Sequence, residues 1–422
     1  MRVVPAFLPA LVATLALAAG GCGSGGEVVL APAAAPVTIA PATTVVRTTA
    51  STVSTTTAAP ATTTTTAAPA TTTTTTTTTT LPMGPTALEC VADLPIGLRV
   101  GQVLLPVVVQ SELPVVADLA SRGLVAGAVV VGPAGDGFAP AVAAVQEASA
   151  TGPVVIAVDE EGGNVQRFAS LLGDLPSAVE MAAWPADEVR RVATERAVAL
   201  AGHGVTVNLA PVLDVGPAPG IGSRSFSDDP VLVAGHGTAF AEGVLAAGLV
   251  PVAKHFPGHG RANADSHEEL ATTPPVDDLR EVDLLPFALV PEGTAVMVGH
   301  LAVPGLTDGV PASLSAAAVT GLLRDELGFD GVVVTDDLSM GAVAQLVDVP
   351  TAARLALIAG ADLLMVGGLA NVVPAAWGLV AALDDRTLDA AWLDEAVERV
   401  LALRDVDPCA LADGGVGRSV ED

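Results

Sequence analysis

The stretch Pro153-Val-Val-Ile-Ala-Val-Asp-Glu-Glu161 carries the pattern that decides the fold. Every residue from Pro153 to Val158 is apolar, and the three residues that follow are acidic. A strand with one wet face alternates apolar and polar residues, whereas a strand covered on both faces is continuously apolar. The stretch therefore predicts a buried parallel strand with carboxylates at its carboxyl end.

Counting this run, eight apolar runs of this kind alternate with stretches of helical spacing. The runs are residues 101–109, 125–131, 153–158, 205–209, 250–253, 295–298, 331–334 and 362–366, and the helical stretches include residues 187–201, 230–247, 313–327 and 388–403. Ser313 and the pair Asp229-Pro230 are suited to begin helices. Eight such units predict an α/β fold, a (β/α)8 barrel of the TIM type. A doubly wound open sheet would give the same alternation.

Reactive side chains follow five successive runs, which favours the barrel. They are Asp159-Glu160-Glu161 after the third run, Asn208 in the fourth, Lys254-His255 after the fifth, His300 after the sixth and Asp336-Asp337 after the seventh. Barrel active sites are assembled at the carboxyl ends of the strands. Capping of the following helices would explain some of these residues equally well.

The segment from Lys254 to His267 has the most unusual composition. It reads Lys-His-Phe-Pro-Gly-His-Gly and then reaches Asp265-Ser266-His267, and Lys254 is the only lysine of the chain. A compact ammonium group suits hydroxyl recognition. The alternative is an ordinary loop with solvent-exposed histidines. Pro257-Gly258 denies His255 and His259 the helical spacing of zinc sites, so we expect neither a metal nor another cofactor.

Three further segments contain candidate site residues. Asp336 and Asp337 follow a buried run, where one carboxylate can serve as a nucleophile while the other caps a helix. Arg167 ends the segment that begins at Asp159, and it offers a forked set of donors. Arg224 lies in the Gly/Ser-rich loop Gly222-Ser-Arg-Ser-Phe226.

Taken together and in order, these motifs resemble glycoside hydrolase family 3, and within it the β-N-acetylglucosaminidase branch. The resemblance rests on Lys254-His-Phe-Pro-Gly-His-Gly, Asp265-Ser-His267, Asp159-Glu-Glu-Gly-Gly-Asn-Val-Gln-Arg167, Gly222-Ser-Arg-Ser-Phe226 and Gly328-Phe-Asp-Gly-Val-Val-Val-Thr-Asp-Asp-Leu-Ser-Met340. It spans residues 98–403.

The resemblance implies a role for each matching residue. Asp336 would be the nucleophile of a retaining mechanism, and His267, paired with Asp265, would be the acid and base. The sugar hydroxyls and the N-acetyl group would be held by Asp159, Arg167, Arg224, Lys254 and His255. Glu160 departs from the family, which commonly has Gln there, and would add charge near the sugar.

The implied activity is exo-acting hydrolysis of terminal N-acetylglucosamine from peptidoglycan fragments or related glycans. Only residues 404–422 follow Leu403, so we expect the acid to come from within the barrel. Aromatic residues make up 3% of the chain, which suits a pocket for one sugar better than a long groove. Two alternatives remain: a phosphorylase that uses the same site, and a lipoprotein that binds sugar without catalysis.

The rest of the chain predicts export. Residues 1–22 are typical of a signal peptide with a lipobox-like end at Cys22, residues 23–84 of a disordered Thr/Ala/Pro-rich linker, residues 85–410 of the barrel and residues 411–422 of a tail. We expect a lipid-anchored protein on the outer face of the membrane, or a secreted one if Cys22 is not lipidated. The net charge of −28 argues against nucleic-acid partners. A monomer with a small carbohydrate or muropeptide substrate is expected.

The two remaining cysteines, Cys90 and Cys409, bracket the barrel. A closed barrel brings its ends together, so an oxidising compartment would allow a disulfide between them. Two free buried thiols are the alternative.

Overall fold

The computed structural model describes residues 85–414. The expected signal peptide, Cys22, the linker and most of the tail fall on residues 1–84 and 415–422, which lie outside the described residues. Within residues 85–414, no helix combines the length and the apolar character that a membrane crossing requires.

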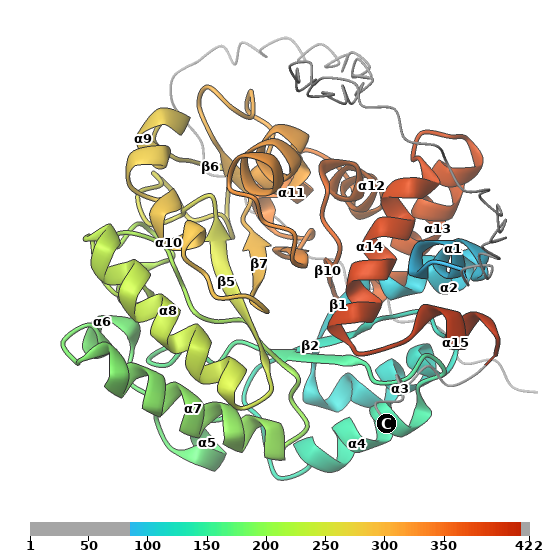
Figure 1. Cartoon of the computed structure of the whole chain (residues 1–422), viewed down its shortest axis with the longest axis horizontal. Coiled ribbons are helices and arrows are strands. Elements are labelled where there is room, and N and C mark those ends of the chain that lie inside the picture. Colours follow the sequence, from blue (N-terminus) through green and yellow to red (C-terminus); the bar gives the residue numbers. More distant parts are fainter. Residues whose placement is uncertain (1–84, 415–422) are drawn as a thin grey trace, which may run out of the picture. The chain divides into compact units, whose positions relative to one another are not determined.

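Eight parallel strands form one sheet in the order β10-β1-β2-β3-β4-β5-β7-β9 (Figure 1). The strands are β1 (Leu104–Val109), β2 (Gly127–Val131), β3 (Val155–Val158), β4 (Val207–Asn208), β5 (Val250–Phe256), β7 (Ala295–Val298), β9 (Val333–Thr335) and β10 (Leu364–Gly367). The first and last strands of this order also meet, through a parallel bridge between Val334 and Leu363. The sheet is therefore closed, which confirms the (β/α)8 barrel and excludes the open sheet.

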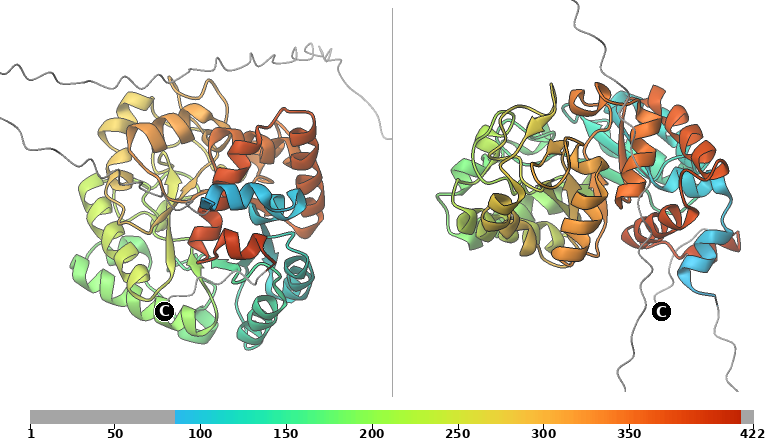
Figure 2. Two further views of the ribbon diagram at one scale, coloured as in Figure 1. Left: turned by 45° about the vertical axis from the view of Figure 1, so that its right-hand side comes forward. Right: turned by 90° about the horizontal axis from the view of Figure 1, so that it is seen from above.

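Helices surround the barrel on its outside (Figures 1 and 2). They are α1 (Ala87–Asp93), α2 (Ile96–Gln102), α3 (Leu113–Ser121), α4 (Phe138–Ala148), α5 (Ala169–Leu172), α6 (Ala178–Met181), α7 (Ala186–Gly202), α8 (Pro230–Ala246), α9 (Val276–Glu281), α10 (Leu284–Ala288), α11 (Gly341–Ala344), α12 (Val349–Ala359), α13 (Val372–Asp384), α14 (Ala390–Leu403) and α15 (Pro408–Ala412). Short 3₁₀ turns are η1 (Gln110–Glu112), η2 (Gly222–Arg224), η3 (Ala312–Leu314) and η5 (Leu369–Asn371), whereas η4 (Ala317–Glu326) is a π-helix of 10 residues. Two short strands, β6 (Ala271–Thr272) and β8 (Leu301–Ala302), pair outside the barrel.

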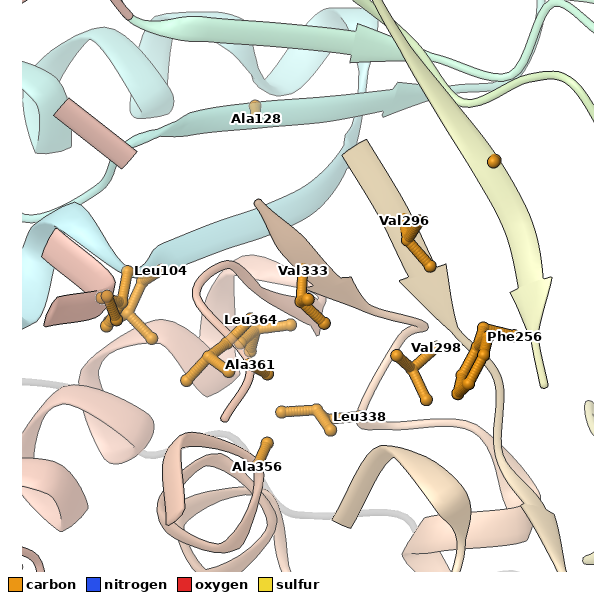
Figure 3. Packing of buried hydrophobic residues seen from close by; sticks show 14 of the residues in the cluster. Leu104, Ala128, Phe256, Val296, Val298, Val333, Leu338, Ala356, Ala361 and Leu364 are labelled. Atoms are coloured by element: carbon orange, nitrogen blue, oxygen red, sulfur yellow. The ribbon is translucent and has the colours of Figure 1, made fainter. Parts of the chain in front are cut away.

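Alternate residues of each strand belong to two different apolar layers. Leu104 and Val296 belong to the outer layer between strands and helices, the cluster of buried residues that Figure 3 draws and that also includes Ala356 of α12. Their chain neighbours Leu105 and Met297 belong to the layer inside the barrel. Because both faces of the strands are covered, most strand residues are apolar, and polar ones such as Asn208, Lys254 and His255 stand toward the carboxyl ends.

Two predicted element boundaries differ from the structure. Strand β5 continues through Phe256, so Lys254 and His255 are strand residues and do not follow the strand. Ser313 was expected to begin a helix, but it lies in the short turn η3 ahead of η4. Its hydroxyl is buried against His300 Nδ1 at 2.7 Å, and this hydrogen bond replaces the expected capping contact. Asp229 caps α8 as predicted, with Val231 N–H as donor at 2.9 Å.

The ends of the described chain are joined covalently. Cys90 of α1 and Cys409 of α15 form a disulfide across a Cα–Cα distance of 4.9 Å. The closed barrel places α1, which precedes the first strand, beside α15, which follows the last strand. The two paired cysteines are therefore 319 positions apart in the sequence.

Candidate active site

A cavity of about 390 Å³ opens at the carboxyl ends of the barrel strands. Its polar lining comprises Asp159, Arg167, Arg224, Lys254, His255, His267, Asp336 and Asp337, and its apolar lining comprises Val107, Val131, Val165, Met297, Met340 and Met365. Another cavity, of about 340 Å³, lies at the amino ends of the strands around Val250 and Thr294. None of the site residues predicted from the sequence lines that second cavity.

Lys254 is at the centre of a buried network of charges. Its Nζ lies 2.7 Å from Asp159 Oδ1 and 2.6 Å from Glu161 Oε1. Arg167 Nη2 reaches the other oxygen of Asp159 at 2.9 Å. Burial alone would raise the pKa of Asp159, but the charges of Lys254 and Arg167 outweigh it and hold that pKa well below its ordinary value. Asp159 is therefore an ionised acceptor at the cavity wall.

Arg224 extends the network from the loop that follows β4. Its Nε and Nη2 donate to the two oxygens of Glu161, each at 2.8 Å. Burial opposes ionisation of Glu161, yet Lys254 and Arg224 lower its pKa below the ordinary value. Each cation of the cavity lining thus has a carboxylate partner, and the network holds its side chains in fixed positions.

Asp214 positions the histidines of β5 and the loop after it. Its carboxylate accepts His255 Nδ1–H at 2.7 Å and the backbone N–H of His259 at 2.6 Å. Burial would raise its pKa, but the two histidines lower it to about 2. Because Nδ1 donates to Asp214, Nε2 of His255 is free to accept from Arg224 Nη2, which lies 3.4 Å away.

His267 and Asp265 lie on the loop between β5 and β6. His267 Nδ1 is 2.7 Å from Asp265 Oδ1, and the backbone N–H of His267 donates to the same oxygen at 3.0 Å. These hydrogen bonds lower the pKa of Asp265 against a desolvation that would raise it. The imidazole is 62% exposed. Since Nδ1 is occupied, Nε2 is the nitrogen that can exchange a proton with a bound molecule.

The two aspartates after β9 have different partners. Asp337 Oδ1 accepts three hydrogen bonds, from Ser339 N–H, from Ser339 Oγ–H and from Gly367 N–H, each at 2.8 Å. Asp336 accepts one, from the backbone N–H of Asp337 at 2.9 Å. Burial would raise the pKa of Asp336, but the neighbouring histidines His300 and His255 help to lower it. Asp336 is therefore an ionised carboxylate with lone pairs available to the cavity.

The structure brings Asp159, Arg167, Arg224, Lys254, His255, His267 and Asp336 to one cavity, with Asp265 held against His267. Glu160, which was expected to add charge near the sugar, does not line the cavity. It is fully buried and pairs with Arg196 of α7 at 3.0 Å. Burial raises the pKa of Glu160, although backbone N–H groups and Arg196 oppose this shift.

Neither Glu161 nor Asp214 was predicted from the sequence as a site residue. Glu161 stands in a run of three acids, and which of them faces Lys254 depends on the turn after β3. Asp214 lies beyond the apolar run 205–209 and has no motif around it. Across residues 85–414, no group of three or more His, Cys, Asp or Glu side chains is arranged to hold a metal ion.

Comparison with known proteins places the chain in a family. The model of the glycosyl hydrolase family 3 N-terminal domain matches residues 136–403. Beta-hexosaminidase LpqI of Mycobacterium tuberculosis is 44% identical over 269 residues, which are 61% of this chain and 69% of that protein.

Solved structures agree with this assignment. A glycosyl hydrolase of the same family from Mycobacterium smegmatis has a TM-score of 0.70 and 39% identity, over 74% of this chain and 98% of the other. A family 3 β-N-acetylglucosaminidase from Paenibacillus has a TM-score of 0.69 and 32% identity, over 78% and 65%. The chain therefore belongs to glycoside hydrolase family 3 and is a hydrolase.

Proposed function

We propose that the protein is an exo-acting, retaining β-N-acetylglucosaminidase that removes terminal N-acetylglucosamine from peptidoglycan fragments or related glycans. One observation carries the proposal. Asp336 and His267 line the same cavity from different strands and loops, and Asp265 orients His267 so that its Nε2 is free. A carboxylate nucleophile and a proton donor on one cavity are the two groups that a retaining glycosidase requires.

In the first step, Asp336 attacks the anomeric carbon while the imidazolium of His267 donates its Nε2 proton to the leaving oxygen. The glycosidic bond breaks, and a bond between the sugar and the Asp336 carboxylate forms. The negative charge of Asp265 stabilises the imidazolium. The pKa of Asp336 lies below the ordinary value, so the nucleophile is ionised at neutral pH.

In the second step, His267 works in the opposite direction. Its neutral Nε2 takes a proton from a water molecule, and the water oxygen attacks the anomeric carbon. The bond to Asp336 breaks, which returns the carboxylate and the imidazolium to their starting states. One group serves as acid and then as base because the two steps are mirror images of each other.

The shape and the lining of the cavity support a small substrate. Its volume lies within the range of about 300–1,000 Å³ that is typical of ligand pockets. The buried charges at Asp159, Arg167 and Lys254 offer both acceptors and donors to sugar hydroxyls. The relatives named above are a beta-hexosaminidase and a β-N-acetylglucosaminidase. We further propose lipid anchoring at Cys22 on the outer face of the membrane, where wall fragments are found.

The test is turnover of 4-nitrophenyl N-acetyl-β-glucosaminide by the purified protein. Asp336→Ala and His267→Ala should each lose at least about 100-fold in kcat, the lower range of what a positioned proton donor supplies. Asp330→Ala and His203→Ala are matched controls outside the cavity and should keep wild-type rates. Wild-type turnover in both cavity variants would refute the mechanism, and saturable binding without any product would identify a sugar-binding protein.

The electrostatics of the cavity favour hydrolysis over phosphorolysis. A phosphate acceptor needs unpaired cations, but Arg167, Arg224 and Lys254 of the lining each contact a carboxylate. N-acetylglucosamine should therefore be the product both with and without inorganic phosphate. The sugar 1-phosphate in reactions that contain phosphate would support the phosphorylase instead.

A further inference from the structure

The loop that carries His267 contacts the segment that follows Asp336. We call residues 257–270 the acid loop. The backbone N–H of Gly341 donates to the carbonyl of His267 at 3.2 Å. Gln345 Nε2 donates to the carbonyl of the next residue, Glu268, at 2.7 Å. Both donors belong to α11 and the residue directly after it, and both acceptors are backbone atoms of the acid loop.

Gly341 leaves no room for a side chain at this contact. A Cβ at this position would lie 2.4 Å from the carbonyl oxygen of Glu268 and 2.8 Å from that of His267. The backbone of Gly341 does not adopt the left-handed conformation that favours glycine. Glycine is thus required here by the close approach of the acid loop. It is not required by the backbone conformation, which any amino acid can adopt.

Other contacts fix the base of the acid loop, and a hydrogen bond of 3.1 Å between His259 Nε2 and Ser266 Oγ ties the residue before His267 to that base. Arg261 Nη2 is paired with the buried Asp283 at 2.5 Å. Gly260 accepts a hydrogen bond from the backbone N–H of Ala218 at 2.9 Å. The side chain of His267 is largely exposed, so Asp265 and the main chain of the acid loop determine where the imidazole lies.

We propose that Gly341 and Gln345 form a loop dock that holds His267 in line with Asp336. Neither residue lines the cavity, so both are positioning residues. The dock begins five residues after Asp336 in the sequence. Contact of the acid loop with the dock therefore fixes the position of the acid, His267, relative to the nucleophile, Asp336. The inference rests on the proposed function, because it assumes that His267 is the acid.

A dock that positions the acid has a chemical signature. Protonation matters most when the leaving group is a poor one, such as an alkyl alcohol. A dinitrophenolate leaves without help, so its release does not depend on His267. A displaced acid loop should therefore harm alkyl glycosides and spare dinitrophenyl glycosides, whereas general damage to the fold would harm both equally.

The test compares kcat/KM for a methyl and a 2,4-dinitrophenyl N-acetyl-β-glucosaminide in Gly341→Ala, Gln345→Ala and Gln345→Glu. Gln345→Glu keeps the size of the side chain but puts a carboxylate against the carbonyl of Glu268. Gly235→Ala is the matched control, because Gly235 lies in α8 with open space around it. Inhibition by free N-acetylglucosamine reports on the sugar pocket independently.

We expect Gly341→Ala to lose about 10- to 100-fold on the methyl glycoside and less than about twofold on the dinitrophenyl glycoside, since small misplacements of a catalytic group cost this much. Gln345→Glu should lose more than Gln345→Ala, with unchanged inhibition by N-acetylglucosamine. Equal losses on both substrates, or wild-type rates, would overturn the dock. If His267→Ala also shows no leaving-group dependence, the proposed function fails as well.

Discussion

At the scale of single residues, the site depends most on Lys254. This side chain is 2% exposed and contacts two carboxylates, so it neutralises charge that the barrel could not otherwise bury. Burial would lower the pKa of Lys254, but Asp159 and Glu161 raise it, and the ammonium stays charged. Asp159, which binds sugar hydroxyls in our proposal, therefore depends on Lys254 for its position.

Replacing Lys254 with methionine should destabilise the protein and abolish sugar binding. Methionine keeps the length of the stem but removes the ammonium between Asp159 and Glu161, which then keep only Arg167 and Arg224 as partners. Removing one partner of a buried ion pair costs about 3–5 kcal/mol. Urea unfolding measures the change in the free energy of unfolding.

The matched control for this measurement is Arg190→Met. Arg190 pairs with Asp187 and Glu242 on the surface, and exposed pairs contribute about 0–1 kcal/mol. Equal losses in the two variants would show that the Lys254 network contributes no more than a surface pair.

At the scale of elements, Arg167, Arg224 and His267 were predicted from motifs of the family resemblance. The alternation of apolar runs was enough to predict the barrel and five residues of the cavity lining, namely Asp159, Lys254, His255, Asp336 and Asp337. It worked because strands buried on both faces are continuously apolar and because their carboxyl ends meet. Asp214 was not predicted because its position depends on the turn after β4. The sequence did not show that Glu160 points away from the cavity, because this depends on its contact with Arg196 of α7, which is distant in sequence.

The disulfide between α1 and α15 should stabilise the fold without affecting catalysis. The double variant Cys90→Ser, Cys409→Ser should lose about 2–4 kcal/mol of unfolding free energy, as typical disulfides contribute. Its kcat and KM should equal those of the wild type, because neither helix lines the cavity. A reducing agent should destabilise the wild type and leave the double variant unchanged; destabilisation of both by the reductant would contradict this account.

At the scale of the whole molecule, buried carboxylates make stability depend on pH. Asp159, Glu161 and Asp214 all have pKa values below their ordinary ones. Such groups stabilise the fold fully above their unfolded pKa values, near 4, and lose that contribution as the pH falls through the folded values. Glu160 and Asp362 have raised pKa values, so their effect on the pH dependence of the unfolding free energy has the opposite sign.

The variant Asp214→Asn isolates one part of this dependence. In the wild type, the folded pKa of Asp214 of about 2 implies that the ionised carboxylate adds about 2 kcal/mol to the free energy of unfolding above pH 5. This contribution disappears by about pH 2. Chemical unfolding at pH 7, 5, 4 and 3 should therefore show a smaller decline for Asp214→Asn than for the wild type. Parallel pH profiles would show that Asp214 does not carry this linkage.

The most direct test of the account is to trap the sugar on the enzyme. A 5-fluoro derivative of N-acetylglucosaminyl fluoride should form a slowly hydrolysed glycosyl-enzyme, and peptide mapping by mass spectrometry should find the added sugar on Asp336. His267→Ala should form the same adduct, because fluoride leaves without protonation, but should release it more slowly. An adduct on Asp337 or another residue, or turnover of the reagent with no adduct on Asp336, would contradict the central claim.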